Sequence, residues 1–122
     1  MSAEQTEHSA TQLEENLKKA LTEMLLLTLL SRKESYIAEL TDAIHEKSNG
    51  NLSIVFPYGA IYRMEQAGHI CEVGKRIAPD GRRRQYFGIT AAGREYLNQQ
   101  QAVYAAFTAG VARLLEEREE NP

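Results

Sequence analysis

The sequence has almost no cysteine and no long apolar run. Cys71 is the one cysteine among 122 residues, so no intrachain disulfide can form, which favours a reducing, cytoplasmic setting. The most apolar stretch, residues 24–30, is far shorter than the about 20 residues that a membrane-spanning helix needs, and we expect no membrane partner. Residues 1–12 are polar and acidic, and we therefore expect no secretory signal peptide.

Motifs of catalysis and of metal binding are missing as well. The sequence contains no glycine-rich phosphate loop, no GxSxG and no HExxH. His69 and Cys71 stand two residues apart, but no second ligand pair accompanies them, and a zinc site needs about four ligands. An ordinary pair of strand residues is the better interpretation. The sequence therefore predicts no metal, no cofactor and no enzyme.

Acidic residues outnumber basic ones, but the two signs are unevenly distributed. The formal net charge is −3. Six of the 14 lysines and arginines, against three acidic residues, fall within residues 53–89, whereas both ends of the chain are acidic. This basic middle section is the part of the chain suited to a polyanion, and the acidic total argues only mildly against nucleic acid.

Apolar residues recur at helical spacing in three segments of the first half. The first stripe begins at Leu13 and becomes apolar on all sides in its second half, so this helix must be covered by its own domain and by a partner. The second helix follows a polar break at residues 32–35 and ends at Ser48-Asn49-Gly50-Asn51, which is a stop signal. The third spans residues 57–67, with proline in its first turn and glycine directly after it.

A β-hairpin is predicted after the third helix. Pro79-Asp80-Gly81 is a turn sequence, and it separates strand segments at residues 69–77 and 83–89. Thr90 is suited to cap the helix that follows. Three helices, a hairpin and a long last helix give a mainly α, α+β fold of the winged helix-turn-helix kind, with the hairpin as the wing. The predicted division is a flexible tail over 1–11, a DNA-binding domain over 12–89, a dimerisation helix over 90–117 and a tail over 118–122.

The last helix carries an apolar stripe suited to pairing with another helix. Leu97, Tyr104 and Val111 lie seven residues apart, and so do Phe107 and Leu114. Alanines between them are small enough to permit the close approach of a second helix. We therefore predict a homodimer built from the first and last helices. The predicted interface residues are Leu17, Leu21, Met24, Leu97, Tyr104, Phe107, Val111 and Leu114.

The hairpin is the strongest functional feature of the sequence. Lys75 and Arg76 precede its turn, and Arg82, Arg83 and Arg84 follow it. Guanidinium groups bind phosphate through paired hydrogen bonds and lysine binds it as a point charge, so this hairpin is suited to the backbone or minor groove of double-stranded DNA. A solvated charged turn is the alternative, and the three preceding helices favour the wing.

The third helix offers fewer groups that can read bases. Arg63 is the one residue here able to make a two-pronged contact to guanine, and an ion pair with a neighbouring acid is an equal alternative. Tyr62 can reach a phosphate or a thymine methyl group. DNA shape is therefore expected to supply part of the specificity. With Pro57, Ile61 and Met64 towards the core, the outer face presents Ser53, Phe56, Gly59, Tyr62 and Arg63.

Three segments resemble the PadR family of bacterial transcriptional regulators, together from about Leu21 to Leu97 and, in the short form of that family, through the last helix. Residues 24–30 resemble the apolar first helix. Residues 49–68 resemble the lead-in and the recognition helix, with Tyr58 at the position of the family's tyrosine. The most specific segment, Gly-Arg-Arg-Arg-Gln-Tyr-Phe-Gly-Ile-Thr-Ala-Ala-Gly-Arg-Glu-Tyr-Leu at residues 81–97, resembles the wing strand and the entry to the last helix.

The resemblance implies a homodimer that represses transcription at a palindromic operator and releases it when an effector is sensed. It implies that the last helix crosses the partner's first helix, and that a small hydrophobic or aromatic effector can bind between the subunits. The sequence departs from the family at residues 54–57, where Ile-Val-Phe-Pro replaces a Pro-Gly-Thr-Leu stretch, and it contains no tryptophan. Tyr104 and Phe107 are candidates for an effector pocket, although packing in the dimer core is the simpler explanation.

A winged-helix module for protein interaction is the alternative function. The acidic total and the apolar surface of the third helix at Phe56 and Tyr62 favour a protein partner. The arginine cluster of the hairpin favours DNA. Replacing Arg82, Arg83 and Arg84 by alanine separates the two, because DNA binding would collapse and binding to a protein partner would survive.

Overall fold

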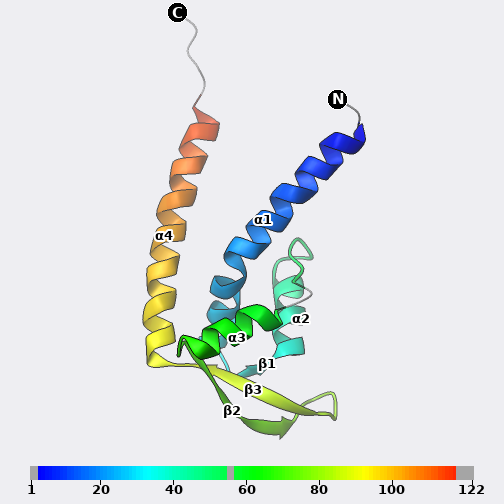
Figure 1. Ribbon diagram of the computed structural model, residues 1–122, viewed down its shortest axis with the longest axis vertical. Helices are drawn as coiled ribbons and strands as arrows, with labels where there is room; N and C mark the ends of the chain where they lie inside the picture. The colour runs from blue at the N-terminus through cyan, green and yellow to red at the C-terminus, as the bar shows by residue number, and fades with distance from the viewer. Residues whose placement is uncertain (1–2, 55–56, 118–122) are drawn as a thin grey trace, which may run out of the picture.

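The computed structural model describes residues 3–54 and 57–117. Its four helices and three strands confirm the predicted α+β fold class and the order of its main elements. Helices α1 and α4 diverge from a shared base, and the strands lie at this base, away from the free ends of the two helices (Figure 1). The elements are α1 (Ala3–Leu30), β1 (Ser35–Tyr36), α2 (Ile37–Lys47), α3 (Tyr58–Gln66), β2 (Ile70–Ile77), β3 (Arg83–Ile89) and α4 (Ala91–Glu116).

The ends of the chain differ in part from the predicted division. Helix α1 begins at Ala3, so residues 3–11 are helical where the sequence predicts a tail. Helix propensity explains the difference, since an established helix extends through a polar segment that contains no proline or glycine. The tail predicted over residues 118–122 lies outside the described residues.

Local signals place the element boundaries where the sequence predicts them. The hydroxyl of Thr90 accepts a hydrogen bond from the backbone N–H of Gly93, at 3.0 Å, and so caps α4. Gly68 has a φ of +79°, the left-handed conformation that ends α3. In the hairpin turn, the N–H of Gly81 donates to the carbonyl of Ala78 at 2.9 Å.

The sheet has three antiparallel strands in the order β1-β3-β2. Strand β1 is absent from the sequence prediction, because two residues are too few to show an alternating pattern. Its Tyr36 pairs with Tyr86 of β3. A bulge between Glu72 and Gly74 interrupts the pairing of β2 with β3, and Gly74 has a φ of +138° that favours glycine.

The hydrophobic core lies where α1, α2, α3 and the sheet meet. Leu26 and Leu27 of α1 are fully buried there, beside Phe87 of β3. On α3, Ile61 and Met64 face this core, as the sequence predicts. Leu97 corrects an expectation: it is 4% exposed and belongs to the core, whereas the sequence placed it in the dimer interface. The first turns of α4 are therefore part of the domain core.

Candidate nucleic-acid interface

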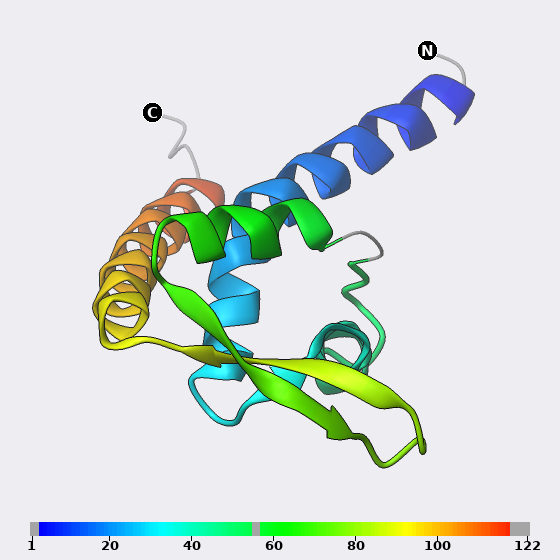
Figure 2. The ribbon, with the colours of Figure 1, turned by 60° about the horizontal axis from the view of Figure 1, so that its bottom comes forward.

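The basic hairpin has two faces with different roles. Side chains alternate between the faces of a strand, so Arg76 and its cross-strand partner Arg84 share one face. Lys75 and Arg83 lie on the other face, and both side chains are exposed. The hairpin is long and projects beyond the helices (Figure 2). One face is therefore attached to the domain, and the other is open.

Arg84 is held next to the turn of the hairpin. Its guanidinium donates to one carboxylate oxygen of Asp80 at 2.7 and 3.2 Å, and it lies 5.2 Å from the centre of the Tyr36 ring. The hydrogen bond from Arg84, together with one from the backbone N–H of Arg82, holds the pKa of the Asp80 carboxyl below its usual value. The same hydrogen bond raises the pKa of Arg84. Burial, followed by the charge of Asp80, raises the pKa of Tyr36.

Arg76 is held in the same way by a different acid. Its guanidinium donates to Glu34 at 2.6 Å and lies 4.8 Å from the centre of the Tyr86 ring. The rings of Tyr36 and Tyr86 meet edge to face, with centroids 5.4 Å apart. Two arginines and two tyrosines thus form one stack that orients the hairpin on β1 and the start of α2.

Lys75, Arg82 and Arg83 are the cations left for a ligand. All three are exposed, and within residues 3–54 and 57–117 no carboxylate forms an ion pair with them. Uncommitted guanidinium and ammonium groups on a projecting hairpin are suited to phosphate oxygens. The sequence predicts five basic contacts here, and the structure divides them into two held cations and three open ones.

A hollow of about 360 Å³ joins the hairpin to the helices. Tyr58, at the first position of α3, lines it and is 62% exposed. Arg83 and Arg84 line its other side, and the first turn of α2 forms its floor. Peptide N–H groups at a helix start attract anions, so a phosphate placed here meets positive charge on several sides. The structure therefore brings together Tyr58, Arg83 and Arg84, three of the residues that the sequence analysis proposes for DNA binding.

Arg63 does not face the same way. Its Nε donates to Glu23 of α1 at 3.2 Å, which is the ion pair that the sequence allows as an alternative. Gly59 leaves room for this arrangement, because a Cβ there would lie 3.3 Å from the Arg63 Nη1 atom. Tyr62 is 64% exposed and, with Tyr58, is one of the two large aromatic side chains that α3 leaves open. Phe56 lies outside the described residues.

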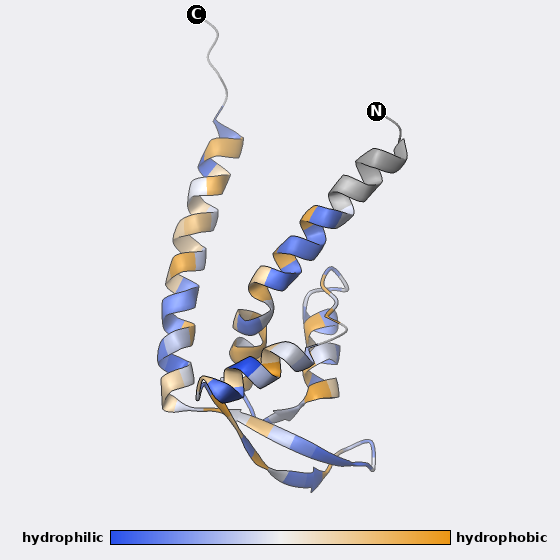
Figure 3. Cartoon of the chain, viewed as in Figure 1, coloured by the Kyte–Doolittle hydropathy of each residue, from blue (hydrophilic) through white to orange (hydrophobic). Residues whose placement is uncertain are grey.

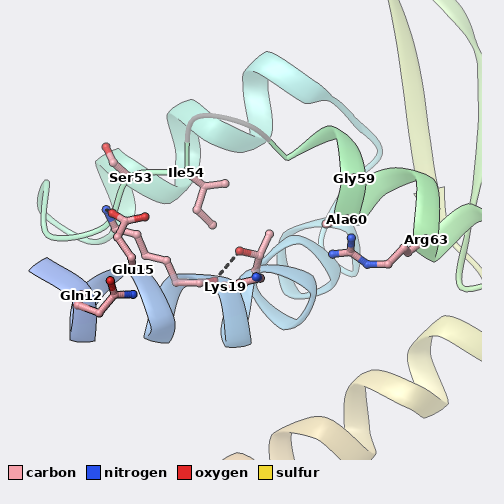
Figure 4. Close-up of a pocket in the computed structure, with 10 residues that line it drawn as sticks. Gln12, Glu15, Lys19, Ser53, Ile54, Gly59, Ala60 and Arg63 are labelled. Atoms are coloured by element: carbon pink, nitrogen blue, oxygen red, sulfur yellow. Dashed lines mark hydrogen bonds and ion pairs between the residues drawn. The ribbon is translucent and has the colours of Figure 1, made fainter.

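Ser53 also lies away from the hairpin. It lines a second hollow, of about 610 Å³, between α1 and the segment that leads into α3. Figure 4 shows Ser53 at one end of this hollow and Arg63 at the other, with Glu15 and Lys19 of α1 beside them. The Ser53 hydroxyl is 3.2 Å from Nδ1 of His45. The structure thus separates Ser53 and Arg63 from the group formed by Tyr58 and the wing.

The sequence analysis missed Glu34, Tyr36 and Tyr86. Tyr36 and Tyr86 had a weak signal, since tyrosine favours strands and Tyr86 lies within the predicted strand over residues 83–89. Glu34 had none, because its partner Arg76 is 42 residues away and only the folded chain brings them together. These three residues carry no positive charge, and they orient the wing by holding Arg76 and Arg84.

A third hollow, of about 720 Å³, lies between α1 and α4; we call it the α1–α4 groove. Phe107 and Leu114 on α4 are 70% and 74% exposed, and Leu17 on α1 is 52% exposed. Apolar positions recur along α4 almost to its end (Figure 3). Within the described chain, the Gln100 side-chain oxygen is buried without a hydrogen-bond partner beside this groove. Its lining residues include Leu17, Leu21, Met24, Tyr96, Gln100, Tyr104 and Phe107.

The described residues also lack a metal site and a membrane-spanning helix. Among the described residues, no group of three or more His, Cys, Asp or Glu side chains is placed to hold a metal ion. No helix in that part of the chain is long and apolar enough to span a bilayer. Cys71 is exposed and has no disulfide partner in the chain.

Comparisons with known proteins agree with this geometry. Residues 26–99 match the model of a family described as the transcriptional regulator PadR-like family. A search of curated proteins gives no match. Among solved structures, a PadR family transcriptional regulator from Eggerthella lenta has a TM-score of 0.79 at 21% identity, covering 95% of this chain and 100% of that one.

Two other solved structures are similar over slightly less of the chain. A PadR-like transcriptional regulator from Bacillus cereus has a TM-score of 0.73 at 23% identity and covers 84% of this chain and 99% of its own. A transcriptional regulator from Clostridium thermocellum has a TM-score of 0.71 at 22% identity, with 83% and 96% covered. At these identities the likeness establishes the fold, and the winged-helix prediction is confirmed.

Proposed function

The chain belongs to the transcriptional regulator PadR-like family, and from this premise we propose that it is a homodimeric repressor that binds a palindromic operator. The resemblance seen in the sequence is thereby confirmed. The family consists of DNA-binding regulators, so the chain is a transcriptional regulator and not an enzyme. A regulator of transcription acts where the DNA is, and we therefore place it in the cytoplasm. In this proposal residues 12–89 bind DNA and residues 90–117 pair the subunits.

One observation carries the proposal: the basic hairpin and the C-terminal end of α4 lie at opposite ends of the molecule (Figure 1). The three open cations project from one end. The apolar stripe of α4 extends from the other. This arrangement lets two copies pair through their helices and leaves both hairpins free for DNA.

A second copy is the occupant that best fits the apolar stripe. Val103, Phe107 and Leu114 are exposed in the single chain, and a patch of this kind on a soluble domain marks an interface. The stripe runs along a helix of 26 residues with seven-residue spacing, which suits another helix rather than a globular surface. The partner's α4 would enter the groove beside Leu17, Leu21 and Met24.

Pairing through these helices gives the DNA-binding geometry. The two α3 helices of such a dimer face successive major grooves, about 34 Å apart. Lys75, Arg82 and Arg83 of each wing then contact phosphates on either side. If six to ten phosphates are neutralised per dimer, affinity falls by about 10³- to 10⁵-fold between about 50 and 200 mM salt.

An effector is proposed to act at the same groove. In the part of the groove that the partner's α4 leaves open, Tyr96, Tyr104 and Phe107 supply aromatic walls without a tryptophan. The unpaired oxygen of Gln100 can accept a hydrogen bond from a ligand. A small hydrophobic or aromatic compound bound here favours one of two angles between the subunits and so releases the operator.

A salt titration tests the proposal. Binding of the full chain to DNA from its own promoter region is measured by fluorescence anisotropy, with random DNA as competitor. We expect tight, competitor-resistant binding that weakens steeply with salt. Equal weak binding to both DNAs would instead support the protein-interaction module, whose contact surface would include the exposed Tyr58 and Tyr62.

A further inference from the structure

Helix α4 begins on the end of α3, and Thr90 joins the two. The Thr90 hydroxyl donates to the carbonyl of Gly68 at 2.6 Å and accepts from the N–H of Gly93 at 3.0 Å. The N–H of Thr90 donates to the carbonyl of His69 at 3.0 Å. The cap of α4 is therefore bonded directly to the residues that follow α3, although the hairpin separates the two helices in the sequence.

Gly93 shows how closely the two segments approach. A Cβ at this position would overlap the carbonyl oxygen of His69, so any other residue would push α4 away from the turn after α3. The N–H of His69 in turn donates to the carbonyl of Met64, in the last turn of α3, at 2.9 Å. His69 is thus bonded to α3 on one side and to the start of α4 on the other.

We call these bonded residues, Gly68, His69, Thr90 and Gly93, the α3–α4 joint. A ring stack adds a second contact between His69 and a residue farther along α4. The rings of His69 and Tyr96 lie face to face, with centroids 4.2 Å apart and planes within 15° of parallel. Tyr96 lies one and a half turns into α4, so the stack holds α4 at a distance from its cap. Neighbouring Leu97 packs into the core, and the ring stack adds a contact whose geometry is defined by the planes of the two rings.

We propose that the His69–Tyr96 stack positions the recognition helix α3 on the dimerisation helix α4 and so sets the spacing of the two α3 helices in the dimer. The inference rests on the proposed function, because such a spacing exists only in a dimer that binds DNA. His69 and Tyr96 are positioning residues: their effect on DNA passes through α3. Tyr96 also lines the α1–α4 groove, so whatever occupies the groove contacts the same joint.

The test varies the distance between half-sites. The operator is first located by footprinting, and duplexes are then made with one or two base pairs inserted or deleted at its centre. Each inserted pair turns one half-site by about 35° and moves it by about 3.4 Å relative to the other. For the unaltered protein we expect each step to cost about tenfold in affinity, because a rigid joint cannot follow the shift.

His69→Leu and Tyr96→Leu keep an apolar side chain and remove the stack. We expect both variants to bind the best duplex more weakly than the unaltered protein does. We also expect their affinity to fall by less than about threefold for each inserted or deleted base pair, because α3 can now adapt to the shifted half-site. His69→Phe keeps a stacking ring and should restore the steep dependence. Asn98→Ala, on the exposed side of α4, is the matched control and should behave like the unaltered protein.

Sedimentation and thermal unfolding separate this effect from a general loss of structure. A variant that stays folded and dimeric, yet keeps the full penalty for each inserted pair, would overturn the inference while leaving the proposed function intact. Should Tyr96→Leu fail to fold, His69→Leu decides, since the His69 side chain is only half-buried. An unaltered protein that neither dimerises nor binds its promoter would overturn the proposed function and this inference together.

Discussion

Arg84 donates two hydrogen bonds to a single carboxylate oxygen of Asp80, at 2.7 and 3.2 Å, across the base of the hairpin turn. The carboxylate of the hairpin turn therefore lies next to one of the cations of the wing. A phosphate that approaches Arg84 must compete with this carboxylate. Asp80 thus orients Arg84 and at the same time reduces the charge that the wing presents to DNA.

Asp80→Asn should increase binding to random DNA. Asparagine keeps an acceptor for the N–H of Arg82, which Asp80 binds at 3.0 Å, but it removes the negative charge beside Arg84. We expect affinity for random duplexes to rise by roughly two- to tenfold at low salt, and the slope against salt to steepen by about one. Fluorescence anisotropy over a salt series measures both. Glu116→Gln, at the far end of α4, makes the same change in net charge and should have no such effect.

The pH dependence of the wing should follow the depressed pKa of Asp80. The hydrogen bonds from Arg84 and Arg82 lower the folded-state value below the usual 3.8. The Asp80–Arg84 pair therefore stabilises the fold at pH values above the pKa that Asp80 has in the unfolded chain. This contribution is lost as the pH falls through the lower pKa of Asp80 in the folded protein. Carbon NMR of the Asp80 carboxyl should give a midpoint below 3.8. A midpoint at or above that value would show that the pair does not persist in solution.

The open and held cations of the wing should behave differently. Arg83→Ala should weaken binding to all sequences alike and reduce the salt slope by about one, because it removes a phosphate contact. Arg76→Ala should change the slope less, since its guanidinium is already paired with Glu34. It should instead lower Tm by about 2–5 °C, because the stack on Tyr86 is lost. Anisotropy measures the salt slope and calorimetry measures Tm. A larger change of slope in Arg76→Ala and a larger change of Tm in Arg83→Ala would contradict the division into held and open cations.

Boundary signals in the sequence act over short distances, and for that reason they predict the fold well. Thr90 caps a helix through Gly93, three residues on. Pro79-Asp80-Gly81 forms its turn with the residues on either side. Each of these contacts depends on residues that are neighbours in the chain, so their order along the sequence is enough to place three helices, a hairpin and a last helix.

The site depends on contacts between distant residues, and these were only partly predictable. Arg63 meets Glu23 across 40 residues, and nothing in either segment decides between that ion pair and a base contact. Leu97 has the spacing of the apolar stripe of α4, but its position near the start of that helix places it against the core. Residue type and period gave the chemistry of the wing, and the tertiary fold decided which cations remain open.

Tyr62 should matter more for DNA than Arg63. Arg63 is directed towards α1 by its ion pair with Glu23, whereas Tyr62 is 64% exposed on α3. We expect Tyr62→Ala to reduce affinity for the operator by about tenfold or more, and Arg63→Ala to change it by less than about threefold. Competition between operator and random DNA measures both. A large loss of base preference in Arg63→Ala would show that the guanidinium leaves Glu23 when DNA binds.

Phe107→Asp should separate the subunits of the proposed dimer. Phe107 is 70% exposed in the single chain and lines the α1–α4 groove, so a partner helix would bury it. A carboxylate in that interface has no cation to pair with among the groove-lining residues, and we expect the dimer dissociation constant to rise by about 100-fold or more. Sedimentation equilibrium measures it.

Asn98→Asp is the matched control for that change. It adds the same charge to α4 nine residues earlier, which is two and a half turns and therefore the opposite side of the helix. We expect this variant to remain a dimer and to bind the operator normally. Because the two half-sites are bound together only by a dimer, operator affinity should fall with dimerisation in Phe107→Asp. A Phe107→Asp protein that remains dimeric would show that the subunits pair through another surface and that the α1–α4 groove serves a different occupant.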